Sequence, residues 1–291
     1  MSEKARSSSE EPAVFPLLNR RSFSASVFFS GSLCGGSDHS AKDAQMHLHL
    51  LRRGSLCLQT QGGAARQIDR PSLIFFPRAQ DHRLEARELP GAELVCARLT
   101  FTGPEAELLL LSLPDLLVIP LDAPIGLGPV VERLFDEAFT PAFGHDAAVD
   151  LIAELLLVLL LRHCIAEGLT EGGLLAGLGD AKLARALVAM HDRPAEDLNI
   201  EQLAAIAGMS RSNFAAAFKQ RVGTSPGDYL ATLRLALAKQ ALLQGTSLKT
   251  VAPLVGYRSA TALARVFQRQ FGCGPRDWLA QQQRSADPGD G

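Results

Sequence analysis

Residues 199–226 read NIEQLAAIAGMSRSNFAAAFKQRVGTSP, and this stretch predicts two short helices joined by a tight turn. Gly208 is the residue type that ends a helix with a positive φ, and Ser210 is a type that caps the next helix. Phe214 and Phe218 lie four residues apart, so they share the inner face of the second helix. The stretch is therefore a candidate helix-turn-helix unit.

Residues 247–272, SLKTVAPLVGYRSATALARVFQRQFG, repeat this plan. Ser247 and Ser259 can each cap a helix, and Gly256 can end the first of the two. Pro253 lies inside that first helix, where it removes one backbone hydrogen bond, so we expect a kink there. The chain thus contains two candidate units of one kind.

A third helix is predicted between the two units, from Pro226 to Gln244. Proline suits the first turn of a helix, and Gly245 suits its end. Some eighteen residues at about 1.5 Å each span roughly 27 Å. This length is close to the ~34 Å between successive major-groove faces of DNA, so one stiff helix could present both units to the same side of a duplex.

Together these stretches resemble the DNA-binding domain of the AraC/XylS family of transcription regulators, and the resemblance extends to about Trp278. The residues that carry it are Leu203-Ala204-x-x-Ala207-Gly208-Met209-Ser210, Phe214-x-x-x-Phe218-Lys219-x-x-x-Gly223-x-Ser225-Pro226, Val251-Ala252-x-x-Val255-Gly256-Tyr257 and Phe267-x-x-x-Phe271-Gly272-x-x-Pro275.

The resemblance implies that the second helix of each unit is a recognition helix. It places the following residues on DNA: Arg211, Ser212, Ala215, Ala216 and Lys219 in the first unit, and Arg258, Thr261, Arg265 and Arg269 in the second. Arginine can donate two hydrogen bonds to guanine and alanine can contact a thymine methyl, whereas Lys219 and Arg269 suit phosphate. Because Ala215 and Ala216 are short, we expect the first unit to read less sequence. The alternative for any of these residues is a side chain that only faces solvent.

The N-terminal half predicts a barrel or sandwich of short strands, which makes the whole chain an α+β protein. Turn signals such as Gly35-Gly36, Gly54 and Pro77 separate the strands. The predicted strands are residues 24–29, 47–52, 55–59, 72–76 and 94–101, and predicted helices follow at 129–139 and 147–167.

This half resembles the cupin-type sensor barrel that often precedes the AraC-type DNA-binding domain. His47 and His49 lie two residues apart and so share one face of a strand. His82 follows the Pro77 turn, where cupins commonly place a metal-binding histidine. Three imidazoles suit Zn²⁺, Cu²⁺ or Ni²⁺. The glutamate of the enzymatic cupin motif is missing, and the alternative is that the histidines bond only to neighbouring backbone.

Cys34 and Cys96 are candidate redox-sensing residues, because the resemblance extends to regulators that sense oxidants such as reactive chlorine species through a cysteine pair in these regions. A thiolate near Arg98 or a histidine would be more reactive. The alternative is that Cys96 is a small buried apolar residue. The chain has five scattered cysteines, which argues against a structural disulfide framework.

Charge is distributed unevenly along the chain. Residues from Asp180 onward contain 14 Lys and Arg against 9 Asp and Glu, a net charge of +5, whereas the preceding residues carry −7. A basic module joined to an acidic one suits a DNA-binding unit with a separate sensor. We expect a tail at 1–20, a sensor and dimerisation domain at 21–170, a Gly-rich linker at 171–180, a DNA-binding domain at 181–282 and a tail at 283–291.

The expected function is regulation of transcription, with activation as the expected sign and a small ligand or thiol oxidation as the signal. The resemblance implies promoter DNA, RNA polymerase and a second copy of the chain as partners. The most apolar run, residues 151–161, is shorter than the about 20 residues of a spanning helix, so we expect a cytoplasmic protein whose apolar run packs on the barrel or forms a dimer contact. The alternative function is a metal-dependent cupin enzyme, such as a dioxygenase or isomerase, with an appended DNA-binding domain.

Overall fold

A computed structural model of the chain describes residues 23–43, 45–86, 91–103, 105–122, 126–140 and 142–286. These residues form two compact units. The first contains residues 23–102 and 110–171, and the second contains residues 103–109 and 172–286. The expected tail at 1–20 lies outside the described residues, as do residues 287–291 of the other expected tail.

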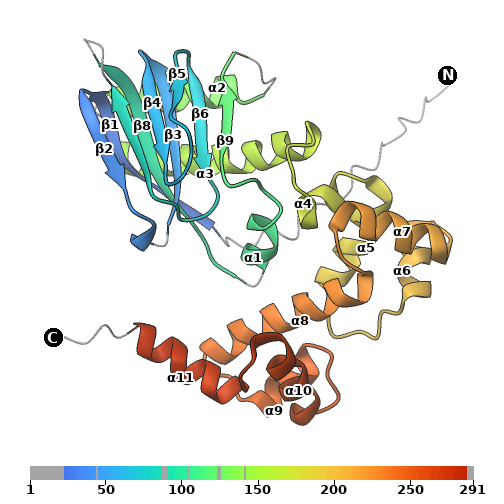
Figure 1. Cartoon of the computed structure of the whole chain (residues 1–291). Coiled ribbons are helices and arrows are strands. Elements are labelled where there is room, and N and C mark those ends of the chain that lie inside the picture. Colours follow the sequence, from blue (N-terminus) through green and yellow to red (C-terminus); the bar gives the residue numbers. More distant parts are fainter. Residues whose placement is uncertain are drawn as a thin grey trace, which may run out of the picture. The chain divides into compact units, whose positions relative to one another are not determined.

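The first unit is built on two antiparallel sheets (Figure 1). The described strands are β1 (Phe23–Leu33), β2 (Gly35–His39), β3 (Met46–Arg53), β4 (Leu56–Thr60), β5 (Arg66–Ile68), β6 (Ser72–Phe76), β7 (His82–Ala86), β8 (Ala92–Phe101) and β9 (Leu117–Pro120). One sheet has the order β1-β8-β3-β6-β9 and the other has the order β2-β7-β4-β5. The predicted barrel or sandwich is therefore confirmed.

Apolar side chains from both sheets form a shared core. Leu51 and Ile74 of the five-stranded sheet belong to the same buried cluster as Leu58 and Leu84 of the four-stranded sheet. Every residue of β6 is buried, which is the pattern of a strand with a neighbour on each face. This core fixes the inward direction of the side chains on β3 and β7, which carry the histidines singled out above.

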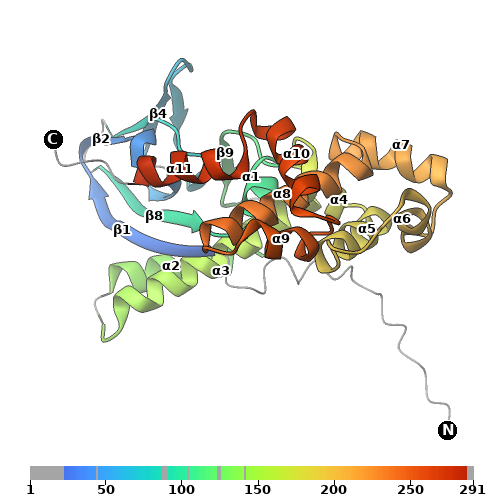
Figure 2. The same cartoon turned by 90° about the horizontal axis from the view of Figure 1, so that it is seen from below.

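Helices α2 (Gly128–Phe139) and α3 (His145–Ala166) pack against each other and against β1 (Figure 2). Leu156, Leu157 and Leu160 of α3 are buried, so the apolar run packs within the unit as expected. Two of its leucines are exposed, Leu151 by 65% and Leu155 by 49%. These two lie four residues apart, so they share one face of the helix.

Besides residues 105–109 of α1, the second unit includes eight helices among the described residues. Their bounds are α4 (Gly173–Leu178), α5 (Ala181–Asp192), α6 (Ile200–Ala207), α7 (Arg211–Val222), α8 (Pro226–Leu243), α9 (Leu248–Leu254), α10 (Ala260–Phe271) and α11 (Pro275–Ala286). The short helix α1 (Glu105–Leu110) links the two sheet-forming parts of the chain. The predicted helical units and the helix between them are confirmed.

Two segments differ from the sequence-based expectation. Gly35-Gly36 was expected to be a turn but begins β2, because pairing with β7 outweighs the low strand propensity of glycine. Within the expected linker at 171–180, residues 173–178 form α4, because Leu174, Leu175 and Leu178 bury one helical face. None of the described helices combines the length and the apolar character that a membrane-spanning helix needs.

Candidate nucleic-acid interface and sensor site

The first helix-turn-helix unit consists of α6, a turn and α7. Asn199 and Gln202 form a capping box at the start of α6, with both hydrogen bonds at 2.9 Å. Gly208 has a φ of 65°, a left-handed conformation that glycine adopts without strain. Ser210 then caps α7 by accepting a hydrogen bond from the backbone of Asn213. These local signals fix where each helix begins and ends.

An aromatic cluster holds α7 against α8. Phe218 of α7 packs edge-on against Tyr229 of α8, with ring centroids 5.7 Å apart. The Tyr229 hydroxyl also lies 2.8 Å from Nε2 of His191 on α5, and both residues are buried. Helix α7 is therefore packed against the helix that leads to the second helix-turn-helix unit.

The second helix-turn-helix unit, which consists of α9 and α10, follows the same plan. Ser259 caps α10 through the backbone of Ala262, and Phe267 packs edge-on against Trp278 at 5.6 Å. Pro253 lies inside α9 as predicted, but the helix ends one residue later at Leu254. The missing N–H of Pro253 removes the intrahelical hydrogen bond to the carbonyl oxygen of Lys249, and α9 ends directly after the proline.

The predicted DNA-contacting residues lie on α7 and α10, except for Arg258, which lies in the turn just before α10. Eight of the nine are exposed, and Ala215 is half-buried. No acidic residue occurs between Arg258 and Phe271, so α10 offers only positive charge to a partner. Arg211 forms a 3.1 Å ion pair with Glu201 of α6, and DNA would compete with this pair.

Arg234 is a structural residue of this interface that the sequence analysis did not identify. Its guanidinium donates hydrogen bonds of 2.7 Å to the carbonyl oxygens of Pro194 and Glu196, next to the first unit. It also lies over the ring of Tyr257 in the second unit, 6.0 Å from the centroid. A Cβ on Gly256 would lie 2.9 Å from this guanidinium, so the position next to Tyr257 requires glycine. One side chain on α8 thus contacts both the loop before α6 and the turn after α9.

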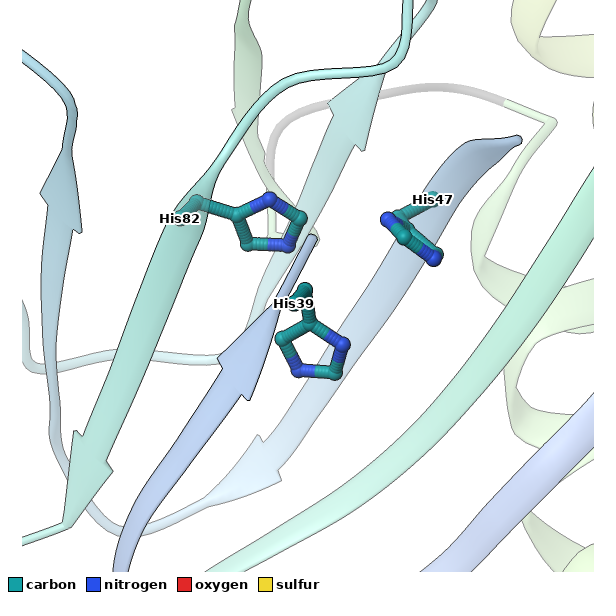
Figure 3. Close-up of side chains that lie close together, drawn as sticks. All are labelled: His39, His47 and His82. Atoms are coloured by element: carbon teal, nitrogen blue, oxygen red, sulfur yellow. The ribbon is translucent and has the colours of Figure 1, made fainter. Parts of the chain in front are cut away.

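A histidine cluster lies between the two sheets of the sheet-containing unit, which comprises residues 23–102 and 110–171. Figure 3 shows the rings of His39, His47 and His82 directed toward a common point from β2, β3 and β7. One ring nitrogen from each of the three lies within 4.8 Å of the other two. His47, His49 and His82 were the predicted ligands, but the group with nitrogens this close contains His39 in place of His49. His39 pairs with His82 in the β2–β7 register. Its signal was hidden because β2 was not expected to be a strand.

Hydrogen bonds assign the tautomers of two of these rings. His82 Nδ1 lies 2.8 Å from the carbonyl oxygen of Gln80, so Nδ1 carries a proton and Nε2 can accept. His49 Nε2 lies 2.9 Å from that acceptor and so donates to it. His49 Nδ1 is buried and has no hydrogen-bond partner among the described residues. Burial lowers the pKa of His49 well below 6.5 and that of His82 to about 4, so both rings are neutral at pH 7.

A cavity of about 480 Å³ opens next to the cluster and is lined by His39 and His82. Both carboxylates that line it have structural partners. Asp38 forms a 2.6 Å ion pair with Arg83, and Asp81 accepts a 2.6 Å hydrogen bond from the backbone of Ala41. The donors that face the cluster are therefore imidazole nitrogens.

The two candidate redox cysteines have different surroundings. Cys34 is exposed between β1 and β2, whereas Cys96 is 3% exposed on β8 and burial raises its pKa to about 12. Cys34 lies next to Gly91, five positions along the strand from Cys96, a separation of about 17 Å at ~3.3 Å per residue. Arg98 lies over the ring of Phe28 at 4.2 Å. The structure does not bring the two thiols together, and none of the five cysteines is in a disulfide.

Comparison with known proteins assigns the family. The profile of the family described as "Cupin" matches residues 14–166, and the profile described as "Helix-turn-helix domain" matches residues 203–281. An uncharacterised HTH-type transcriptional regulator of Haemophilus influenzae is 32% identical over 82% of this chain and 88% of its own length. A putative AraC-like transcription regulator of Streptomyces lividans is 34% identical over 70% of this chain and 69% of its own length. The chain belongs to the AraC family of DNA-binding transcription regulators.

This AraC-family regulator is also similar to a protein of Escherichia coli named RCS-specific HTH-type transcriptional activator RclR, at 29% identity over 79% of this chain and 82% of that one. Among solved structures, the DNA-binding domain of AdpA in complex with a target DNA is 33% identical over 36% of this chain and 96% of that chain, with a TM-score of 0.33. The two family models and the named relatives confirm the expected family, the cupin and helix-turn-helix organisation and the DNA-binding function. The roles of individual residues and the domain limits remain predictions.

Proposed function

We propose that this AraC-family regulator activates transcription by inserting α7 and α10 into successive major grooves of promoter DNA, under the control of its cupin unit. The observation that carries this proposal is the shared attachment of both units to α8. Phe218 packs on Tyr229 at one end of α8, and Arg234 contacts the loop before α6 and Tyr257. Two recognition helices held by one helix suit a duplex better than two independent modules do.

Direct base contacts are assigned to Thr261 and Arg265 on α10 and to Arg258, which lies in the turn just before it. Arg211, Ser212, Ala215 and Ala216 take the corresponding positions on α7. Lys219 and Arg269 lie in the last turns of their helices and are assigned to phosphate. Since short side chains occupy the centre of the outer face of α7, α10 supplies most of the sequence discrimination.

Activation and contact with RNA polymerase are parts of the proposal that rest on similarity. RclR, which aligns with 79% of this chain, is named an activator. An activator acts at promoters, so we assign this chain to the cytoplasm, where a bacterial promoter is found.

A homodimer formed through α3 is also part of the proposal. Leu151 and Leu155 are exposed on one face of that helix, whereas Leu156, Leu157, Leu160 and Leu161 are buried in the unit. Two neighbouring exposed leucines gain free energy when a second copy covers them, at about 25 cal/mol per Å² of apolar surface. Two copies would also bring four helix-turn-helix units to one regulatory region.

The cupin unit acts as a sensor rather than as an enzyme. A cupin enzyme would need a general acid or base beside its histidines. Asp38 and Asp81, which line the cavity, have structural partners in Arg83 and the backbone of Ala41. These contacts give both carboxylates a structural role, which supports ligand binding rather than catalysis as the use of this site.

A thiol signal, if the chain responds to oxidants, begins at Cys34. Cys34 is exposed, whereas Cys96 is buried and its thiol is neutral far above pH 7. A Cys34–Cys96 disulfide needs Cα atoms about 4.4–6.8 Å apart, so it requires β1 to move relative to β8. Oxidation of Cys34 alone needs no such movement.

The proposal is tested by selecting the DNA fragments that the full-length chain binds from a library of genomic fragments. The selected fragments are then footprinted with the same protein. We expect each bound copy to protect one contiguous stretch with two conserved sequence blocks, centred about one helical turn apart. A footprint with a single block, or binding without sequence preference, would contradict it.

A further inference from the structure

We propose that His39, His47 and His82 bind a divalent transition-metal ion such as Zn²⁺, Cu²⁺ or Ni²⁺, and that this ion is the signal to which the regulator responds. The binding site rests on the histidine geometry alone. The signalling role rests in addition on the function proposed above.

The three nitrogens come from three strands and both sheets. They already lie within 4.8 Å of one another. Metal–imidazole bonds of about 2.0–2.1 Å place neighbouring ligands about 3.3 Å apart in a tetrahedral site. An inward movement on the order of 1 Å, shared among three side chains, therefore completes the site. His39 is the last residue of the edge strand β2, which makes it the ligand best able to move.

The donor set decides the kind of ion. Imidazole nitrogens favour zinc, copper and nickel, whereas magnesium and calcium require oxygen ligands. The nearby carboxylates of Asp38 and Asp81 are engaged with Arg83 and with the backbone of Ala41. The hydrogen bond from His82 Nδ1 to Gln80 is the support that metal-binding histidines commonly have, since it directs the Nε2 lone pair toward the ion.

His49 has a different role from the three ligands. Its Nε2–H donates to His82 Nε2, the atom that would bind the ion. A lone pair cannot accept this proton and bind a cation at once, so the ion displaces the hydrogen bond. His49 is completely buried and its other ring nitrogen has no hydrogen-bond partner among the described residues. This arrangement keeps His82 oriented when no ion is bound.

A continuous set of contacts leads from the site to the exposed face of α3. Only Cys34 separates β2, which ends at His39, from β1. The backbone of Val27 in β1 donates a 2.7 Å hydrogen bond to Asp150 of α3. Leu151 is the next residue, and it belongs to the proposed dimer face. Movement of His39 toward an ion would thus be transmitted through β2 and β1 to α3.

The test uses full-length protein freed of metal by a chelator and titrated with Zn²⁺ by calorimetry and with Co²⁺ by visible absorption. We expect one ion per chain and the d–d bands of a low-coordinate nitrogen site. His39→Asn, His47→Asn and His82→Asn should each weaken binding by at least about 100-fold, the upper end of what loss of a supporting residue costs. His163→Asn, on α3, is the matched control and should bind like the parent chain, as should Cys34→Ser.

His49→Gln distinguishes the three-histidine site from a four-histidine one. We expect an affinity within about threefold of the parent or higher, because a competing donor is weakened. A loss as large as that of His39→Asn would overturn the ligand assignment, and so would parental binding by His39→Asn. Near-ultraviolet circular dichroism of the metal-free variants verifies that each one is folded.

The signalling role is tested by measuring affinity for a selected DNA fragment with and without Zn²⁺. We expect the ion to change the affinity of the parent chain by at least about fivefold, a typical coupling, and not that of His39→Asn. An ion that binds at this site without changing DNA affinity overturns the signalling role and leaves DNA binding intact. Absence of DNA binding under both conditions instead counts against the proposed function, while the metal titration is unaffected.

Discussion

The backbone N–H of Val27 donates a 2.7 Å hydrogen bond to the carboxylate of Asp150, which joins the edge strand β1 to helix α3. The register of β1 against β8 shifts between Val27 and Phe29, so this amide lies at an irregularity of the strand. Without Asp150 it would have no side-chain acceptor at this irregular position.

Asp150→Ala should therefore destabilise the sheet-containing unit by about 2 kcal/mol, because a hydrogen bond to a charged group contributes more than a neutral one. Urea unfolding followed by circular dichroism measures this change. Asp150→Asn, which retains an acceptor oxygen, should recover more than half of the loss. Equal losses for both variants would show that the carboxylate charge, rather than this bond, is what matters.

Arg258→Ala and Arg265→Ala should each lower affinity for a selected promoter fragment by about 1–3 kcal/mol and relax base preference at one position. Fluorescence anisotropy on matched and singly substituted duplexes measures both effects. Arg269→Ala should instead weaken binding to all sequences alike and reduce the salt slope by about one. Arg193→Ala is the control. Arg193 is exposed and lies outside both helix-turn-helix units, so its replacement should have little effect on DNA affinity.

Arg234→Ala should weaken binding to a complete two-block site far more than binding to a fragment with one block. The guanidinium contacts Pro194, Glu196 and Tyr257, so its removal loosens one unit relative to the other. We also expect a loss of stability of about 2 kcal/mol, since two carbonyl groups lose a charged donor. Proportional losses on both fragments would indicate that Arg234 contacts DNA itself or only supports the fold.

Alkylation should label Cys34 in the native chain and leave Cys96 and Cys164 unmodified until unfolding. Burial raises the pKa of Cys96 to about 12 and that of Cys164 to about 11, compared with 9 for an ordinary thiol. The unfolded chain therefore releases these protons above pH 9 while the folded chain retains them, so stability should fall as the pH rises from 9 toward 11. Mass spectrometry of iodoacetamide-treated protein and urea unfolding at several pH values measure the two effects. Rapid native labelling of Cys96 would contradict the buried environment.

Leu155→Glu should convert the proposed dimer to a monomer without unfolding the chain, because Leu155 is 49% exposed and is not one of the buried core residues. Light scattering coupled to size-exclusion chromatography measures the mass. Leu254→Glu, at a leucine of α9 that is 61% exposed, is the matched control and should leave the mass unchanged. A parent chain that is monomeric at micromolar concentration would contradict the proposed dimer.

The DNA-binding unit could be predicted from the sequence because its helix ends are encoded locally. Ser210, Ser247 and Ser259 cap helices as expected, and Gly208 and Gly256 have positive φ angles. Arg234 escaped prediction because its acceptors are backbone carbonyls about 40 positions away, which leave no pattern in the sequence.

The sensor site could be predicted only in part. His47 and His49 alternate on a strand that is evident from its apolar residues, and His82 follows a proline turn. His39 follows Gly35-Gly36, and two adjacent glycines normally indicate a turn. Pairing of β2 with β7 is a tertiary contact across some 45 positions, so propensity alone could not reveal that His39 meets His82.

Helix α8 runs unbroken for 18 residues between the two DNA-binding units. Each residue advances a helix by about 100° in rotation and 1.5 Å in length. Deleting or inserting a single residue would turn α10 away from the groove that α7 leaves for it, whereas adding seven would nearly restore its angle but shift it by about 10 Å. Substitutions on the solvent-exposed side of α8 should be tolerated, whereas insertions or deletions in α8 should not be. If α7 and α10 are the recognition helices proposed above, the number of residues in α8 sets their angle relative to each other and therefore the spacing of the bases that they contact in an operator.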